Sequence, residues 1–226
     1  MSWGDAWAAL ALSLRVAGLS TFVTLIFGTA LALLLTWRRL PARHLIDAVV
    51  SAPLVLPPTV LGYYLLIALG RDTVIGRTWE HVFGSPIVFT FTGAVVAASV
   101  GSLPLVVRSI RLGIESIEPN LIAAARTLGA PPWRVLVTVV LPLAAPGIIA
   151  GAMMGFARAL GDYGATQMVV AGRINGTPTA SIFVMEQMLI PDRDHQVFAM
   201  SLATTIVGVT MLYLANRLTH RLHHRG

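Results

Sequence analysis

Arg158 and Asp162 carry opposite charges four positions apart in an otherwise apolar stretch, FARALGDYGAT. Side chains separated by four residues share one face of a helix and can pair. A charge inside a membrane is costly and is usually neutralised by a partner. The spacing therefore predicts a mutual ion pair near the outer end of a membrane-spanning helix. Gly161 and Gly164 beside it would let the backbone bend.

A second group of residues lies in the proline-rich stretch PLVLPPTVLGYYLL, which contains Pro53, Pro57, Pro58 and Thr59. Proline removes a backbone donor and kinks or breaks a helix. Within a membrane, the carbonyl groups that it frees must face protein or water. Two interpretations stay open: a broken helix that lines a passage, or a kink that serves packing. The Thr59 hydroxyl could contact an anion or bond back to its own helix.

Composition excludes most other chemistry. The chain has no cysteine, so a disulfide or a thiolate site is excluded. Its 16 basic residues are all arginine, and without lysine no phosphate-binding loop of the G-x-x-x-x-G-K-[ST] type can form. The histidines of RLTHRLHHRG have no carboxylate or thiol beside them. Glu115 and Glu118 suit solvated or capping roles, so we expect no catalytic, cofactor or metal site on this chain.

The elements that carry these residues are very apolar. The chain has 226 residues, of which 56% are hydrophobic and 12% charged, and its mean hydropathy is +0.77. A helix needs about 20 mostly apolar residues to cross a bilayer. The stretches of that length are 14–37, 46–69, 87–107, 141–160 and 197–214. They predict an all-α, polytopic membrane protein with a single domain, 1–226, and five transmembrane helices. A sixth would follow if the N-terminal region or 161–187 also crosses.

Arginine placement indicates the orientation of these spans. With five spans, the loops on one side hold Arg38, Arg39, Arg43, Arg108, Arg111, Arg126, Arg134, Arg217, Arg221 and Arg225. The loops on the other side hold Arg71, Arg77, Arg173 and Arg193. Because cytoplasmic loops carry the excess of positive charge, we expect the N-terminus outside and the C-terminus in the cytoplasm. The same rule explains the net charge without a nucleic-acid partner.

The cytoplasmic loop 108–140 contains a short helix with well-marked ends. Asn120 is the expected N-cap, and Gly129 suits the left-handed residue that ends a helix. Pro131 and Pro132 favour the start of a new helix near Trp133. Helical spacing places Leu121, Ala124, Ala125 and Leu128 on one apolar face. The two alanines make this face narrow, so another surface can approach the helix closely.

Two other interpretations of this loop are open. A helix-turn-helix DNA reader has a similar outline, but the second helix here, VLVTVVLPLAAPGIIAGAMMGF, is too apolar for a DNA groove. The other alternative is an ordinary interfacial connector with no partner of its own.

The segment AAARTLGAPPWRVLVTVVLP resembles the EAA loop of ABC-importer permeases, whose pattern is E-A-A, three residues, glycine, nine residues and I-x-L-P. The matching positions are Ala124, Ala125, Gly129, Val139, Leu141 and Pro142. Ile122 and Ala123 stand where glutamate would be expected, which removes the basis for an ionic contact there. With PLVLPPTVLGYYLL, IVFTFTGAVVAASVGSLPLVVRSIRLGIE and FARALGDYGAT, the chain is similar to molybdate ABC-transporter permeases. Sulfate and thiosulfate permeases share part of this pattern.

This resemblance implies a MetI-like bundle that pairs as a homodimer in the lipid bilayer of the cell inner membrane. It implies two ABC ATPase subunits below the membrane and a periplasmic or surface oxyanion-binding protein above it. ATP and Mg would be bound by the ATPase, with no cofactor on this chain. The residues implied to couple to the ATPase are Ala123, Ala124, Ala125, Arg126, Leu128, Gly129, Leu141 and Pro142.

The pore or gate candidates are Pro57, Pro58, Thr59, Gly161, Asp162, Tyr163 and Gly164. A carboxylate is a poor ligand for a doubly charged anion, so Asp162 is assigned to gate structure. The implied function is a non-enzymatic permease subunit that moves molybdate by alternating access. Tungstate and sulfate stay open because all three are tetrahedral dianions. A stand-alone channel or secondary transporter should show repeats or paired charges near mid-bilayer, and the sequence shows neither.

Overall fold

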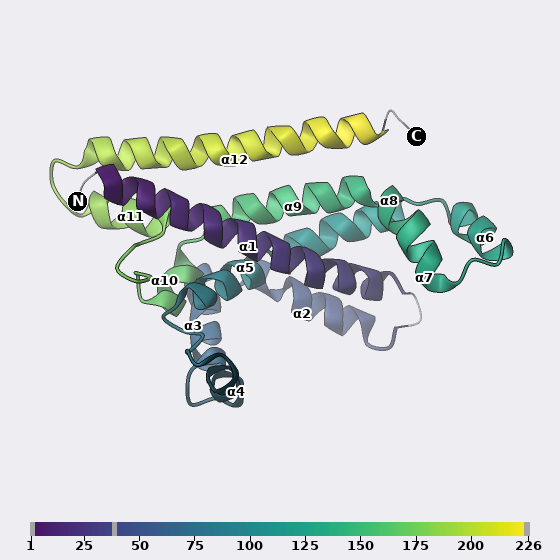
Figure 1. The fold of residues 1–226 in the computed structure, drawn as a ribbon, viewed down its shortest axis with the longest axis horizontal. Helices are drawn as coiled ribbons and strands as arrows, with labels where there is room; N and C mark the ends of the chain where they lie inside the picture. Colours follow the sequence, from purple (N-terminus) through teal and green to yellow (C-terminus); the bar gives the residue numbers. More distant parts are fainter. Residues whose placement is uncertain (1–2, 38–39, 224–226) are drawn as a thin grey trace.

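A computed structural model describes residues 3–37 and 40–223, and the regular structure of these ranges is helical (Figure 1). In chain order the helices are α1 (Trp3–Thr36), α2 (Arg43–Val55), α3 (Pro58–Leu69), α4 (Val74–Phe83), α5 (Phe91–Glu115), α6 (Pro119–Thr127), α7 (Pro132–Val135), the π-helical turn η1 (Leu136–Val140), α8 (Leu141–Leu143), α9 (Ala145–Leu160), α10 (Gly164–Val170), α11 (Ala180–Met188) and α12 (Asp194–His223). An isolated bridge joins Ile174 and Thr177. The all-helical prediction is confirmed.

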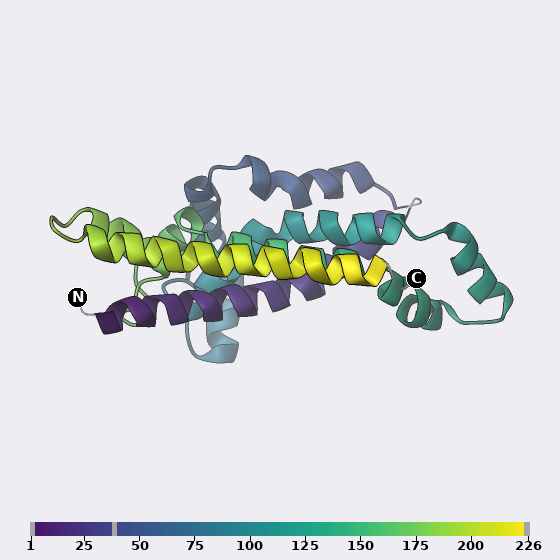
Figure 2. The same cartoon turned by 90° about the horizontal axis from the view of Figure 1, so that it is seen from above.

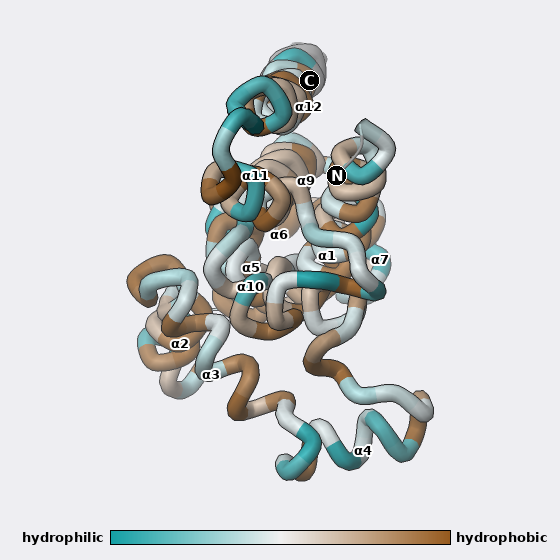
Figure 3. Tube along the Cα trace, turned by 90° about the vertical axis from the view of Figure 1, so that its left-hand side faces the viewer, coloured by the Kyte–Doolittle hydropathy of each residue, from teal (hydrophilic) through white to brown (hydrophobic). Residues whose placement is uncertain are grey.

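Helices α1, α5 and α9 pack against one another and form the centre of the bundle. α12 packs on α9 and α11, along the outside (Figures 1 and 2). Seen end-on in Figure 3, α2, α3 and α4 stand to one side of this centre. The helices are predominantly apolar in the same view, as a membrane environment requires.

Three helices in the described part of the chain are long and apolar enough to cross a membrane: α1, α5 and the 194–214 part of α12. The bent pairs α2–α3 and α7–α9 raise the number to five if each is one span. At about 1.5 Å per residue, the 34 residues of α1 exceed the hydrocarbon thickness of about 30 Å. α1 therefore begins well before the stretch 14–37, and its first turns pack against α11 and α12.

The stretch 46–69 is not one straight helix. It is divided into α2 and α3, whose axes differ by 118°. Leu56 and Pro57 adopt extended backbone (ψ 136° and 138°) between them. The cause is local, since a residue before proline avoids helical geometry and Pro58 suits the first position of the next helix. The prolines therefore break the helix, and the lining of a passage by its two halves stays a prediction.

The loop expected at 108–140 is shorter in the structure. α5 continues to Glu115, so Arg108 and Arg111 belong to this helix rather than to a loop. Their side chains tie α5 to α2: Arg111 Nη1 lies 3.1 Å from Asp47 Oδ2, and Arg108 Nη2 donates to the Ser51 hydroxyl at 3.2 Å.

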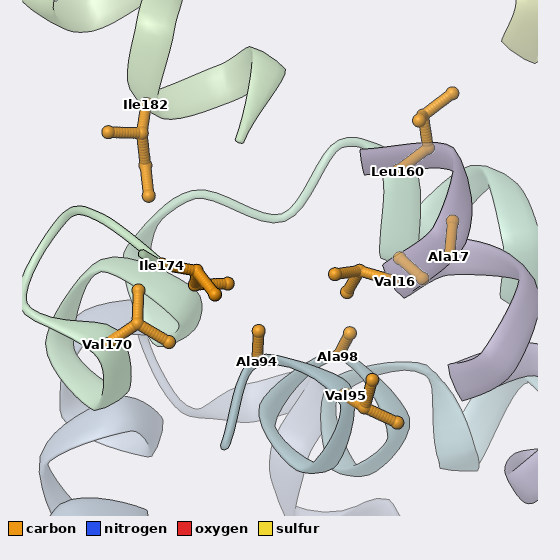
Figure 4. Packing of buried hydrophobic residues seen from close by; sticks show 10 residues of the cluster. Val16, Ala17, Ala94, Val95, Ala98, Leu160, Val170, Ile174 and Ile182 are labelled. Carbon is orange, nitrogen blue, oxygen red and sulfur yellow. The ribbon is translucent and has the colours of Figure 1, made fainter. Parts of the chain in front are cut away.

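Small residues allow the central helices to approach closely. Figure 4 shows a buried cluster to which α1, α5, α9, α10 and α11 all contribute; its members are Val16, Ala17, Ala94, Val95, Ala98, Ala159, Leu160, Val170, Ile174 and Ile182. Farther along, α5 and α9 meet at Gly113 and Gly147, where a Cβ on Gly147 would lie 2.8 Å from Gly113 Cα. The Ser109 hydroxyl donates to Gly147 O at 2.9 Å. Backbone-to-backbone packing of this kind is common where membrane helices associate.

Candidate functional site

The short helix α6 projects from one end of the bundle, away from the spans (Figures 1 and 2). It begins two residues earlier than an N-cap at Asn120 would give, because Glu118 is the N-cap and Pro119 the first helical residue. Its C-terminus follows the prediction. Gly129 has φ 79°, and its N–H donates to Arg126 O at 3.0 Å. Pro131 and Pro132 then start α7, as expected from the sequence.

The apolar residues of α6 divide between two surfaces. Ile122 and Ala125 face the bundle and pack in a cluster with Val135, Val140 and Ala144. The opposite surface is open: Leu128 is 88% exposed and Leu121 47% exposed. The coupling candidates Ala123, Ala124, Arg126 and Gly129 are also exposed, as is Pro142, whereas Ala125 and Leu141 are half-buried.

Ile122 was not among the sequence candidates, although its spacing to Ala125 is helical. Its packing gives a reason for an apolar residue at this position. The side chain holds α6 against the turn that follows, so α6 and α7 are one packed unit. An exposed surface of Leu121, Ala124 and Leu128 then remains free to contact another protein.

Helix runs from α7 to the bend before α9, and a short turn joins α6 to α7. α7 passes through the π-helical turn η1 into α8, and a 65° bend separates this segment from α9. Ala144, at the bend, is fully buried. The bend is followed directly by the contact between Gly147 and Gly113, so the segment that begins at α7 leads into the contact of α9 with α5.

Two groups of gate candidates that lie far apart in the sequence are in contact. Gly164, at the start of α10, lies so close to α3 that a Cβ there would be 2.9 Å from Pro58 Cβ and 3.0 Å from Thr59 N. Gly62 makes the reciprocal approach, with Ala165 Cα 2.8 Å from its hypothetical Cβ. α3 and α10 are therefore packed backbone against backbone. The Thr59 side chain is exposed, with no hydrogen bond to any residue that the structure describes.

The ion pair expected between Arg158 and Asp162 is present, with Nη1 3.1 Å from Oδ1. The second carboxylate oxygen, Oδ2, accepts from the Thr166 N–H at 2.9 Å and the Thr166 hydroxyl at 2.7 Å. Asp162 thus joins the end of α9 to the first turn of α10. Tyr163 lies between them with its side chain partly exposed. Thr166 was not among the residues predicted from the sequence, although it follows Asp162 at helical spacing.

In the described ranges, no group of three or more histidine, cysteine, aspartate or glutamate side chains is placed to hold a metal ion. The side chains of the tail histidines lie outside what the structure describes. The structure has a projecting helix, α6, at one end of the bundle (Figure 1). Toward the other end, glycine contacts join α10 to α3, and Asp162 joins α9 to α10.

Comparisons with known proteins agree with this arrangement. The molybdenum transport system permease protein ModB of Escherichia coli K12 is 49% identical over 160 residues, 71% of this chain and 70% of that protein. The sulfate transport system permease protein CysT of the same organism is 30% identical over 223 residues, 95% of this chain and 79% of that protein.

Among solved structures, the inward-facing MetNI methionine ABC transporter has a similar fold, with a TM-score of 0.76 over 98% of this chain and 99% of that chain. Its sequence identity is 18%, so it supports the fold alone. The model of the family described as "binding-protein-dependent transport system inner membrane component" matches residues 7–225. This multi-pass membrane protein therefore belongs to the family of inner membrane components of binding-protein-dependent transport systems.

Proposed function

We propose that the chain is the permease subunit of an ATP-driven importer that carries molybdate across the cytoplasmic membrane. The observation that carries this proposal is the exposed surface of α6, a helix that projects from the bundle of a chain belonging to this transport family. The substrate is proposed from the permeases named for molybdenum transport, of which one is 49% identical over most of this chain.

The partners follow from the same family. Two copies of the chain would form the translocation path, two ABC ATPases would bind the cytoplasmic face, and an oxyanion-binding protein would deliver substrate from outside. ATP and Mg belong to the ATPase, because a lysine-free chain has no phosphate-binding loop of its own. The N-terminus lies outside and the C-terminus in the cytoplasm, so α6 faces the ATPase.

The packing suggests how ATP binding reaches the gate. The ATPase pulls on α6 through Leu121, Ala124 and Leu128, and α7 to α8 carry the displacement to the start of α9. Gly147 passes it to α5 by direct backbone contact, since neither residue of the glycine pair has a side chain to yield. At its other end, α9 is fixed to α10 through Asp162, and α10 to α3. The bundle opens outward when ATP closes the ATPase pair, and hydrolysis restores the inward-facing state.

Sulfate is the second candidate substrate, because the sulfate permease that matches covers nearly the whole chain. Tungstate shares the same tetrahedral dianion chemistry. The test is uptake of labelled molybdate into proteoliposomes that hold the chain, its ATPase and its binding protein, with excess sulfate as competitor. ATP-dependent uptake that ignores sulfate supports molybdate, and uptake abolished by sulfate moves the chain to sulfate transport. Transport without ATP would instead support a channel and refute the proposal.

A further inference from the structure

Arg158 has more hydrogen-bonding capacity than its partner uses. A guanidinium group has five N–H donors in a planar fork. Only Nη1 is engaged, by Asp162, and no hydrogen bond joins Nε or Nη2 to any residue that the structure describes. The two members of the pair also differ in exposure: the Asp162 side chain is 2% exposed and the Arg158 side chain 29% exposed.

The Nη2 atom of Arg158 lies beside a glycine of α5. Its Nη2 would lie 3.8 Å from a Cβ built on Gly101 of α5, and Leu61 of α3 is at a similar distance from that Cβ (3.9 Å). The guanidinium therefore extends from α9 toward the place where α5 and α3 meet. Gly101 has no side chain, so this position of α5 leaves room beside the guanidinium.

Charge is scarce around this position. Between residues 145 and 170 the sequence carries no charged side chain except Arg158 and Asp162, and it carries none in 58–69 or 91–107. The carboxylate is buried and already receives the two donors of Thr166. A molecule that approaches from the exposed side therefore meets a cation before it meets the carboxylate.

We propose that the Nε and Nη2 edge of the partly exposed Arg158 side chain, which no described residue hydrogen-bonds, is the point on the permease that contacts the oxyanion during its passage, an inference that rests on the proposed function. A guanidinium binds tetrahedral oxyanions through paired N–H donors, and a dianion in an apolar path needs a compensating charge. The ion pair with Asp162 keeps this contact weak, because it occupies Nη1 and leaves fewer donors for the oxyanion. A site on a translocation path must release what it binds.

A purely structural role for Arg158, as the counter-charge of Asp162, makes a different prediction. If neutralising the carboxylate were its whole function, removing both charges together would restore transport. If the guanidinium contacts the oxyanion, transport fails whenever the cation is lost, whatever occupies position 162. The comparison of Arg158→Gln, Asp162→Asn and the double variant therefore separates the two roles.

Uptake is measured in proteoliposomes with the complete complex, together with ATP hydrolysis stimulated by the binding protein. Arg158→Gln is expected to lower oxyanion uptake about ten- to a hundredfold, the loss of a charged hydrogen-bonded contact, while ATP hydrolysis continues. Arg158→Lys should keep part of the uptake, Asp162→Asn most of it, and the double variant should be as slow as Arg158→Gln. Arg173→Gln is the matched control, because Arg173 forms an exposed ion pair with Glu186 and should transport normally.

Recovery of uptake in the double variant would overturn the proposal, as would normal uptake by Arg158→Gln. If Arg158→Gln fails to assemble, cysteine labelling decides, since the chain has no cysteine of its own. Gly101→Cys, which keeps Arg158 and places a thiol beside its Nη2, should react with a water-soluble anionic thiol reagent in the assembled complex, at a rate that changes between the ATP-bound and nucleotide-free states. A thiol that is inert in both states would refute contact with the path.

Failure of the proposed function itself would look different. The unsubstituted complex would then show no ATP-dependent uptake of molybdate or of sulfate. If it carries sulfate instead, the Arg158 comparison is made with sulfate, because the guanidinium recognises the tetrahedral dianion that both substrates share.

Discussion

Replacing Leu128 by asparagine tests whether the exposed surface of α6 binds the ATPase. Burying a whole leucine side chain contributes about 1.5–3 kcal/mol. Leu128 is 88% exposed in the isolated chain, so nearly all of that area is available to a partner. If the ATPase covers it, Leu128→Asn should cost about 1.3–2.6 kcal/mol of binding free energy. At about 1.4 kcal/mol per tenfold, this is a loss of roughly ten- to eightyfold in affinity per contact.

The assay is a titration of the detergent-solubilised permease with purified ATPase, followed by light scattering or an attached fluorophore. The fold should be unaffected, because substitutions of exposed residues usually change the free energy of unfolding by less than about 0.5 kcal/mol. The melting temperature of the permease alone should therefore stay constant while the affinity falls.

The matched control is Leu189→Asn, because Leu189 is 75% exposed but lies after α11, toward the opposite end of the molecule. It should bind the ATPase as the unsubstituted chain does. Equal affinity for Leu128→Asn and the unsubstituted permease would refute the reasoning and leave α6 as a connector. An equal loss in both variants would show a general effect of polarity rather than a docking surface.

Three further predictions concern stability, measured as melting temperatures in detergent. Gly147→Ala should lower the melting temperature by several degrees, because its Cβ would lie 2.8 Å from the backbone of α5 and overpacking costs about 1–3 kcal/mol; Gly18→Ala, with nothing within 4 Å of its Cβ, should not. Thr166→Val removes a 2.7 Å hydrogen bond to a buried carboxylate and should cost about 1.5–3 kcal/mol, whereas Thr205→Val, whose exposed hydroxyl bonds within its own helix, should cost less. Asp47→Asn removes a partly exposed ion pair, so it should cost under about 1 kcal/mol and weaken the dependence of the melting temperature on salt. An unchanged melting temperature in Gly147→Ala would argue against the close contact of α5 and α9.

Local features of the fold were readable from the sequence. The left-handed residue at Gly129 and the new helix after Pro131 depend on backbone preferences of single residues and their neighbours, and both were predicted. The pairing of Arg158 with Asp162 depends on helical spacing alone, and it was also predicted. Helix ends that depend on tertiary packing were harder to predict from the sequence. The extension of α5 to Glu115 and of α1 to Trp3 follows contacts with other helices rather than local hydropathy.

The sequence by itself determined the membrane environment, the helical class and the absence of a nucleotide-binding loop. It also determined which segments hold the coupling and gate candidates. All of these follow from composition or from residues within one helical turn. The tertiary structure decided which surface of α6 is free, because Ile122 and Ala125 turn toward residues that follow in the chain. It also decided that α3 meets α10 through Gly62 and Gly164, and that Arg158 faces the glycine of α5. Such contacts join residues far apart in the sequence, and they depend on how whole helices cross, which no local pattern encodes.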